Sequence, residues 1–239
     1  MSDVRLESIR GPVAVLTGAG VSAESGVPTF RGEDGLWRNF RPEHLATPEA
    51  FHRDPALVWE WYDWRRGLIG SCAPNAAHAT LAEIETALPA FTLITQNVDG
   101  LHQAAGSQHV LELHGNIWRT RCTRCGEVSE DHRAPLPELP PHCPACGGLL
   151  RPDVVWFGES LPADVLDAAW AAAGQCRLML VIGTSAVVHP AASLPLVALR
   201  NGARVVEVNP AETPLSAHAH EVLRGPAAEM LPAWWKKIE

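Results

Sequence analysis

The segment that decides the fold is VAVLTGAGVSA at residues 13–23, where a short apolar run leads directly into a glycine-rich turn. The apolar residues at 13–16 predict a buried strand, and Gly18, Gly20 and Ala23 then occupy a G-x-G-x-x-A pattern. Such glycines permit a tight turn and the close approach of a pyrophosphate, which lies at a helix N-terminus. A plain strand-to-helix turn has the same pattern, so this segment alone leaves nucleotide binding open.

Similar apolar runs recur along the chain and alternate with amphipathic segments. We expect further strands at 91–94, 177–182 and 204–208, and helices at 75–88 and 162–173. Nearly continuous apolar runs are typical of strands that are buried on both faces of a parallel sheet. The alternation predicts an α/β fold, a doubly wound, Rossmann-like parallel sheet that binds ligands at the carboxyl ends of its strands.

Two stretches interrupt the alternation. Residues 54–69 predict a separate helix, because Asp54 can cap it and Pro55 suits its first position. Residues 122–150 are poor in aliphatic residues and rich in proline, so they cannot build a substantial core of their own. Both stretches are therefore expected to be insertions.

Four cysteines can hold the second stretch together. They form two C-x2-C pairs, each followed by a glycine, and this spacing places four thiolates around one Zn²⁺. Because no coordination position is left open, we expect one structural zinc ion. Two disulfides or a redox dithiol are the alternatives. The expected ligands are Cys122, Cys125, Cys143 and Cys146.

A polar loop, TQNVDGLH at 95–102, follows the strand expected at 91–94. Parallel sheets bind ligands at this end of their strands, although a polar loop that caps a helix is the alternative. His114 ends another short alternating run at 111–115. A lone histidine on a strand is usually structural, so His114 gains significance only from the motifs around it.

Composition limits the possible partners. A chain of 239 residues predicts one large domain with a smaller attached or inserted module. The net charge of −8 argues against general nucleic-acid binding. Residues 178–199 are uncharged, but Gly183-Thr-Ser185, His189 and two prolines favour a strand, a loop and a helix start over a membrane span. Without a signal-peptide pattern, we expect a cytoplasmic protein that binds neither membranes nor nucleic acid.

Taken together, the motifs resemble those of the sirtuin family of NAD-dependent protein deacylases. They are GAGVSAESGVPTFRG at 18–32, TQNVDGLH at 95–102, HG at 114–115, the four cysteines, GTS at 183–185 and VNP at 208–210. The resemblance implies a Rossmann-like NAD-binding domain made of residues 1–38, 76–120 and 151–239. It also implies a small domain made of a helical insertion at 39–75 and a zinc-binding insertion at 121–150.

The resemblance implies roles for individual residues. NAD, a consumed co-substrate, would be bound by Gly18, Ala19, Gly20, Ser22, Thr29, Phe30, Arg31, Trp37, Gln96, Asn97, Val98, Asp99, Gly183, Thr184, Ser185, Asn209 and Ala227. The expected catalytic residues are His114 and Asn97. The acyl-lysine peptide would bind by strand addition to the stretch that holds Val155, Phe157 and Gly158.

In the implied reaction, the acyl oxygen of the modified lysine attacks C1′ of the nicotinamide ribose and nicotinamide leaves. His114 then removes a proton through the ribose hydroxyls, so that the 2′-OH attacks the imidate carbon. The products are free lysine, nicotinamide and 2′-O-acyl-ADP-ribose. No hydride moves, which agrees with the lack of the usual acidic ribose anchor about 20 residues after the glycine turn.

Tyr62 and Arg65 indicate the acyl group. They lie three residues apart on one face of the helix expected at 54–69. An exposed aromatic–arginine pair is the interpretation from spacing alone. The pair also resembles the Tyr-x-x-Arg of the bacterial desuccinylase/demalonylase (class III) group, in which it binds the acyl carboxylate. We therefore expect removal of acetyl, succinyl and malonyl groups by a monomeric enzyme.

Four other functions stay open from the sequence. Two lie within the resembling family, a deacetylase without acidic preference and a mono-ADP-ribosyltransferase. The others are an NAD(P) dehydrogenase, which would give a hydride product, and a zinc-ribbon interaction module on a vestigial fold. NAD turnover with nicotinamide release separates the last two from the family.

Overall fold

The larger sheet of this computed structural model, which describes residues 11–29 and 41–238, has six parallel strands in the described part of the chain. They are β1 (Val13–Thr17), β2 (Phe91–Thr95), β3 (Val110–Glu112), β7 (Leu178–Ile182), β8 (Arg204–Val208) and β9 (Glu221–Leu223). Their spatial order is β3-β2-β1-β7-β8-β9. Counted along the chain, this order is 3-2-1-4-5-6, the Rossmann arrangement, so the expected fold class is confirmed.

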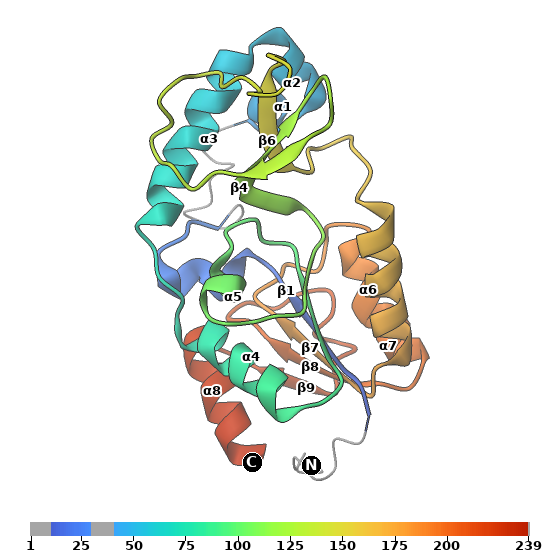
Figure 1. Ribbon diagram of the computed structural model, residues 1–239. Coiled ribbons are helices and arrows are strands. Elements are labelled where there is room, and N and C mark those ends of the chain that lie inside the picture. Colours follow the sequence, from blue (N-terminus) through green and yellow to red (C-terminus); the bar gives the residue numbers. More distant parts are fainter. Residues whose placement is uncertain (1–10, 30–40, 239) are drawn as a thin grey trace.

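Helices cover both faces of this sheet (Figure 1). On one face, α4 (Ala76–Ala87) packs against α8 (Ala227–Ile238), and on the other α6 (Ala163–Gln175) packs against α7 (Leu194–Arg200). Strand β1 supplies both cores, because Val13 and Val15 join the first and Ala14 and Leu16 join the second. This alternation is the two-residue period of a strand that is buried on both sides.

The smaller part of the molecule lies at one end of the larger sheet (Figure 1). Its antiparallel sheet has the order β5-β4-β6. The strands are β4 (Gly115–Cys122), β5 (Val128–Glu130) and β6 (Leu150–Val154), and the helices are α1 (Pro42–Leu45), α2 (Pro48–Arg53) and α3 (Pro55–Gly70). Side chains of the helical and cysteine-containing stretches share one core, in which the indole of Trp59 donates a 2.8 Å hydrogen bond to the carbonyl oxygen of Leu150. The two insertions therefore stabilise each other.

Helix α3 begins as the sequence predicts. The Asp54 side chain accepts a 3.0 Å hydrogen bond from the N–H of Leu57, and Pro55 occupies the first helical position. Tyr62 and Arg65 lie on the buried face of the helix. The alternative of an exposed aromatic–arginine pair is therefore wrong.

Shorter elements complete the described chain. They are η2 (Ala19–Ser25), α5 (Leu101–Ala104) and η4 (Ala191–Ser193). In the described ranges, no helix combines the length and apolar character that crossing a membrane requires.

Candidate active site

The glycine turn lies where the strand order reverses, between β1 and β7. A Cβ added at Gly20 would lie 2.7 Å from the carbonyl oxygen of Gly183, and one at Gly18 would lie 2.9 Å from the same atom. Gly183 itself has a φ of +61°, a conformation that favours glycine. These glycines let two loops at the carboxyl edge of the sheet touch backbone to backbone, and η2 begins within this turn, directly after Gly18.

Ser22 is the centre of a buried polar cluster. Its hydroxyl donates a 2.8 Å hydrogen bond to the Asp99 carboxylate and accepts one of 3.1 Å from the Asn97 amide. The ring of His78 approaches the same oxygen at 3.3 Å. Burial raises the pKa of Asp99, while bonds from the Leu101 N–H and Ser22 oppose that rise. The cluster fixes the amide of Asn97 at the end of β2.

Two buried histidines, His78 and His102, lie beside this cluster and form hydrogen bonds with Ser22 and Thr17. The N–H of Asn75 donates to Nδ1 of His78, so the ring proton resides on Nε2 and points to Ser22. Thr17 donates its hydroxyl proton to Thr95 and therefore accepts from Nε2 of His102 at 2.9 Å. Burial lowers the pKa of His78 to about 4 and that of His102 to about 3. Both rings are consequently neutral at pH 7.

The imidazole of His114 has the tautomer that a general base requires. Its Nδ1 lies 2.8 Å from the carbonyl oxygen of Gln96, which can only accept, so Nδ1 carries the proton. The lone pair is then on Nε2. Burial lowers the pKa of His114, although the bond to Gln96 opposes that change. The ring is therefore neutral and able to accept a proton at pH 7.

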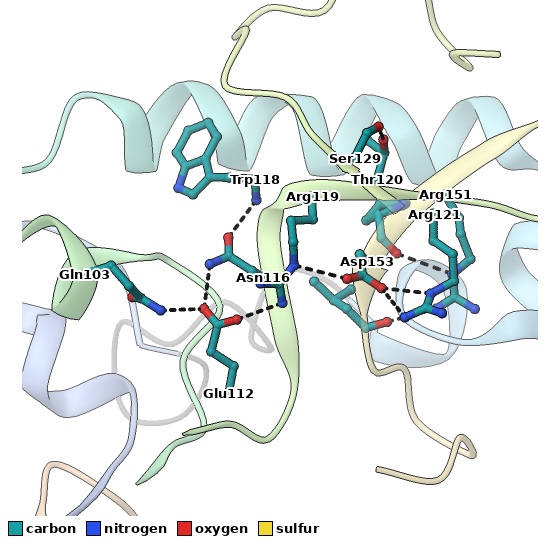
Figure 2. A network of polar contacts seen from close by, with 12 residues as sticks. Gln103, Glu112, Asn116, Trp118, Arg119, Thr120, Arg121, Ser129, Arg151 and Asp153 are labelled. Carbon is teal, nitrogen blue, oxygen red and sulfur yellow. Dashed lines mark hydrogen bonds and ion pairs between the residues drawn. The ribbon is translucent and has the colours of Figure 1, made fainter. Parts of the chain in front are cut away.

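A network of polar contacts braces the segment that carries His114 (Figure 2). Glu112 accepts hydrogen bonds from Gln103 at 2.8 Å and from Asn116 at 2.6 Å, and it pairs with Arg119 at 2.7 Å. Arg119 also donates to Asp153 on β6 at 3.2 Å. The network therefore joins β3 of the large sheet to β4 and β6 of the small one, on both sides of His114 in the sequence.

Residues that follow the carboxyl ends of β2, β7 and β8 meet beside the glycine turn. The Gln96 amide donates to the Thr184 hydroxyl at 3.0 Å, and the Asn209 amide donates to the Thr184 carbonyl at 2.8 Å. Ser185 is exposed beside them, and Ala227 is buried at the start of α8. The structure thus brings the predicted residues of the central and later loops to one edge of the sheet.

Tyr62 and Arg65 form a buried cation–aromatic cluster in the small domain. The guanidinium carbon of Arg65 lies 4.9 Å from the ring centre of Trp61 and 5.9 Å from that of Tyr62. The phenol oxygen of Tyr62 accepts a 3.0 Å hydrogen bond from the indole N–H of Trp156. Burial lowers the pKa of Arg65, and the nearby Tyr62 and Asp99 oppose that change. An anion beside Arg65 would favour its charged form further.

The predicted peptide-binding stretch is tied to both neighbouring regions. The N–H of Val155 donates to the carbonyl oxygen of His114 at 2.9 Å, and that of Phe157 donates to Ala46 at 2.9 Å. Gly158 is exposed with a φ of +89°, and the Phe157 side chain is also exposed. The backbone of this stretch is therefore held by hydrogen bonds to its neighbours, while the Phe157 side chain and Gly158 remain accessible to a substrate.

The four predicted zinc ligands converge. Their sulfur atoms all lie within 4.8 Å of one another, with Cys122–Cys146 at 3.4 Å and Cys125–Cys143 at 3.8 Å. Tetrahedral coordination with Zn–S bonds of about 2.3 Å requires sulfur separations of about 3.8 Å. Gly126 and Gly147 have φ values of +77° and +70°, as the turns of the two C-x2-C pairs require. The cluster fits one structural zinc ion.

Some predicted residues lie outside the described ranges, and the structure adds others. Phe30, Arg31 and Trp37 are not among the described residues, whereas Thr29 and Val98 are half-buried. His78, His102 and Trp156 were not assigned roles from the sequence. The Asn75-x-x-His78 spacing at the start of α4 is a capping signal that points to His78.

Comparisons with known proteins find relatives of one family. The Sir2 family model matches residues 18–190. The NAD-dependent protein deacylase of Aquifex aeolicus is 61% identical over 204 residues, which cover 85% of each chain. The NAD-dependent protein deacylase of Thermus thermophilus is 53% identical over 232 residues, which cover 94% of this chain and 89% of that protein.

Solved structures give the same result. A mutant of a Sir2 homologue in complex with ADP-ribose has a TM-score of 0.91 and 50% identity, covering 95% of this chain and 91% of that chain. A complex of a Sir2 homologue with NAD has a TM-score of 0.88 and 50% identity, covering 95% and 90%. A Sir2 mutant with a deacetylated p53 peptide and 3′-O-acetyl ADP-ribose has a TM-score of 0.85 and 35% identity, covering 95% and 93%.

Proposed function

The chain belongs to the Sir2 family and is an NAD-dependent protein deacylase, and from this premise we propose that it removes acetyl, succinyl and malonyl groups from lysine, with Tyr62 and Arg65 binding the acidic ones. The observation that carries the proposal is the burial of Arg65 beside Tyr62 on α3. The planar fork of a guanidinium binds a carboxylate through two hydrogen bonds, and the acyl group of a succinyl or malonyl lysine ends in such a carboxylate.

The proposed catalytic residues act on one edge of the sheet. NAD, when bound, supplies the ribose carbon that accepts the acyl oxygen. Nδ1 of His114 stays bonded to the Gln96 carbonyl, so Nε2 is positioned to accept a proton from a ribose hydroxyl. Asn97, held by Ser22, would orient the ribose and nicotinamide half, and Gly18, Gly20 and Ser22 would lie against the phosphates. Thr184 and Asn209 would hold the adenosine half.

We propose strand addition as the mode of peptide binding. The p53 peptide in the related Sir2 structure supports a polypeptide substrate. Because the N–H groups of Val155 and Phe157 are bonded to His114 and Ala46, a substrate strand would pair with carbonyl groups of this stretch or with the N–H of Gly158. We also propose that the protein is a monomer and that it is cytoplasmic. A reducing compartment would keep the clustered cysteine thiols from forming disulfides.

The decisive experiment compares acyl groups on one peptide sequence. We expect Arg65→Met to lower kcat/KM for the succinylated peptide by roughly 10- to 150-fold relative to the acetylated peptide, the range of a charge-assisted hydrogen bond. NAD, His114 and the peptide groove are common to both reactions, so their contributions cancel in the ratio. Arg53→Met, an exposed arginine at the end of α2, is the matched control and should leave the ratio unchanged.

The same measurements separate the alternatives. An unchanged succinyl-to-acetyl ratio in Arg65→Met would show that Arg65 does not bind the carboxylate. An equal loss of both activities would indicate that Arg65 only holds α3 in place. Mass spectrometry of the products separates deacylation from transfer of ADP-ribose to the protein substrate.

A further inference from the structure

We propose that Trp156 is a positioning residue for acyl-group specificity, because its indole N–H orients the Tyr62 hydroxyl as a hydrogen-bond donor into the acyl pocket, the proposed binding region of the acyl group beside Tyr62 and Arg65. The inference rests on the proposed function of Tyr62 and Arg65. It assigns to Trp156 an effect on the choice of acyl group that is separate from the peptide contacts of its neighbours.

The direction of the Trp156–Tyr62 hydrogen bond follows from chemistry. The two atoms are 3.0 Å apart and buried, and an indole N–H can only donate, so the phenol oxygen accepts. The single phenol hydrogen must then point elsewhere. No hydrogen-bond acceptor for it lies among the residues that the structure describes. Burial raises the pKa of Tyr62, so the hydroxyl keeps this hydrogen at neutral pH.

The indole of Trp156 is held against rotation. The guanidinium carbon of Arg151 lies 3.5 Å from the Trp156 ring centre, and Phe51 packs against the ring at 5.3 Å. Arg151 binds both carboxylate oxygens of Glu159, at 2.6 and 2.9 Å. Glu159 in turn accepts a 2.8 Å bond from the backbone N–H of Trp156. A fixed ring means that the indole hydrogen keeps one direction, and so does the phenol that accepts it.

The arrangement acts on acidic and apolar acyl groups in opposite ways. A carboxylate can accept both from Arg65 and from the oriented Tyr62 hydroxyl, which lie on the same buried face of α3. The methyl of an acetyl group accepts nothing, so it would leave the buried phenol hydrogen without a partner. Specificity therefore comes from attraction of the acid and from a penalty on the apolar group.

The test is a double-mutant cycle on the succinyl-to-acetyl ratio of kcat/KM. Trp156→Phe should lower the ratio by about two- to tenfold, the range expected for one neutral hydrogen bond. If Trp156 acts through Tyr62, adding Trp156→Phe to Tyr62→Phe should lower the ratio no further. An unchanged ratio in Trp156→Phe, or an equal fall in both backgrounds, would overturn the proposal.

A matched control and a second variant keep the test decisive. Trp59→Phe removes another buried indole hydrogen bond from the same core, to the Leu150 carbonyl, and should leave the ratio unchanged. Should Trp156→Phe fail to fold, benzothienylalanine at this position keeps the ring shape without the N–H and should lower the ratio equally. Arg65→Met tests the proposed function separately, because a large effect there with none from Trp156→Phe refutes only the role of Trp156.

Discussion

Glu112 on β3 and Arg119 on β4 form a 2.7 Å ion pair across the junction of the two sheets, with His114 between them in the sequence. Figure 2 shows that Glu112 is also the shared acceptor of Gln103 and Asn116. The side chains of Glu112 and Arg119 are 11% and 31% exposed, so solvent screens the pair only in part. The pair thus links the two sheets beside the proposed base.

We expect Glu112→Ala to lower the free energy of unfolding by about 1–3 kcal/mol, because the side-chain amide of buried Asn116 loses its acceptor and partly buried Arg119 keeps only Asp153. Urea denaturation measures this change. Glu130→Ala, which removes an exposed glutamate from β5, is the control and should change stability by less than about 0.5 kcal/mol. The acyl ratio should stay constant in both variants. A ratio that changed with Glu112→Ala would show that the network reaches the acyl pocket.

The pKa of His114 predicts the acid limb of the activity profile. The proposed role of His114 as general base requires the neutral ring, and burial lowers its pKa below the ordinary value, so the ring loses its proton at a lower pH than an exposed histidine. We therefore expect the acid limb of kcat/KM to have its midpoint below about pH 6.5, the ordinary pKa of histidine. His114→Ala should remove deacylation while the fold is kept. An acid limb of kcat/KM with its midpoint above about pH 6.5 would contradict the role of His114 as the general base.

The buried pair His78 and His102 predicts a pH dependence of stability. Their folded pKa values are about 4 and about 3, below the unfolded value of about 6.5, so the unfolded state binds more protons. Stability should therefore be complete above pH 6.5 and fall as pH drops towards 4, by up to about 1.4 kcal/mol per pH unit for each ring. His102→Gln should lower this slope by up to about 1.4 kcal/mol per pH unit, the contribution of one ring.

Urea unfolding at pH 7, 6 and 5 measures that slope. The exposed His52 provides the control, because His52→Gln should leave the slope at its wild-type value. Zinc release at low pH contributes equally to all variants and cancels in the comparison. A wild-type slope in His102→Gln would mean that other groups take up the protons.

The larger sheet was predictable where its strands are continuous apolar runs. Residues 204–208 were expected as a strand and form β8, and 91–94 became β2 with one more residue. The edge strands β3 and β9 have three half-buried residues each, too few to show a period. Helix α8 was not among the expected elements. Pro232 lies within it, and packing of its tryptophans against the sheet outweighs the helix-breaking tendency of proline.

For the candidate site, the sequence motifs predict individual residues but not the hydrogen bonds between them. Motifs identify Ser22, Asn97 and Tyr62, whose side chains need local turns or a helix face. The partners that orient them come from distant segments, since Ser22 and His78 are 56 residues apart and Tyr62 and Trp156 are 94 apart. No local pattern encodes such contacts, because they form only when the two insertions and the sheet pack together.

The cysteine cluster predicts that zinc stabilises the small domain. Cys143→Ser should lower the bound zinc from one ion per chain to nearly none, and it should destabilise β4–β6 by several kcal/mol, because the metal supplies folding free energy. Elemental analysis and thermal denaturation measure the two effects. Cys72→Ser changes a cysteine outside the cluster and should retain the zinc. Wild-type protein purified without zinc would rule out this role.

Substitution of Gly20 by alanine should destabilise the protein, whereas the same substitution at Gly67 should stabilise it. In Gly20→Ala the new Cβ would lie 2.7 Å from the Gly183 carbonyl oxygen and 2.8 Å from its Cα, and neither backbone atom can turn aside. The β1 and β7 loops must then separate, which should cost about 1–3 kcal/mol of stability and raise the KM for NAD several-fold.

Gly67 is the matched control for Gly20→Ala. It is an exposed position within α3, and apart from its chain neighbours and the nearby backbone of α3, no described atom lies within 4 Å of its added Cβ. Gly67→Ala should therefore stabilise the protein by about 0.5–1 kcal/mol, since alanine favours helix, and leave the KM for NAD unchanged. Opposite signs for the two variants in urea denaturation would show that glycine at position 20 is required for the contact with Gly183. Equal KM values in Gly20→Ala and wild type would instead show that the loop contact does not shape the NAD site.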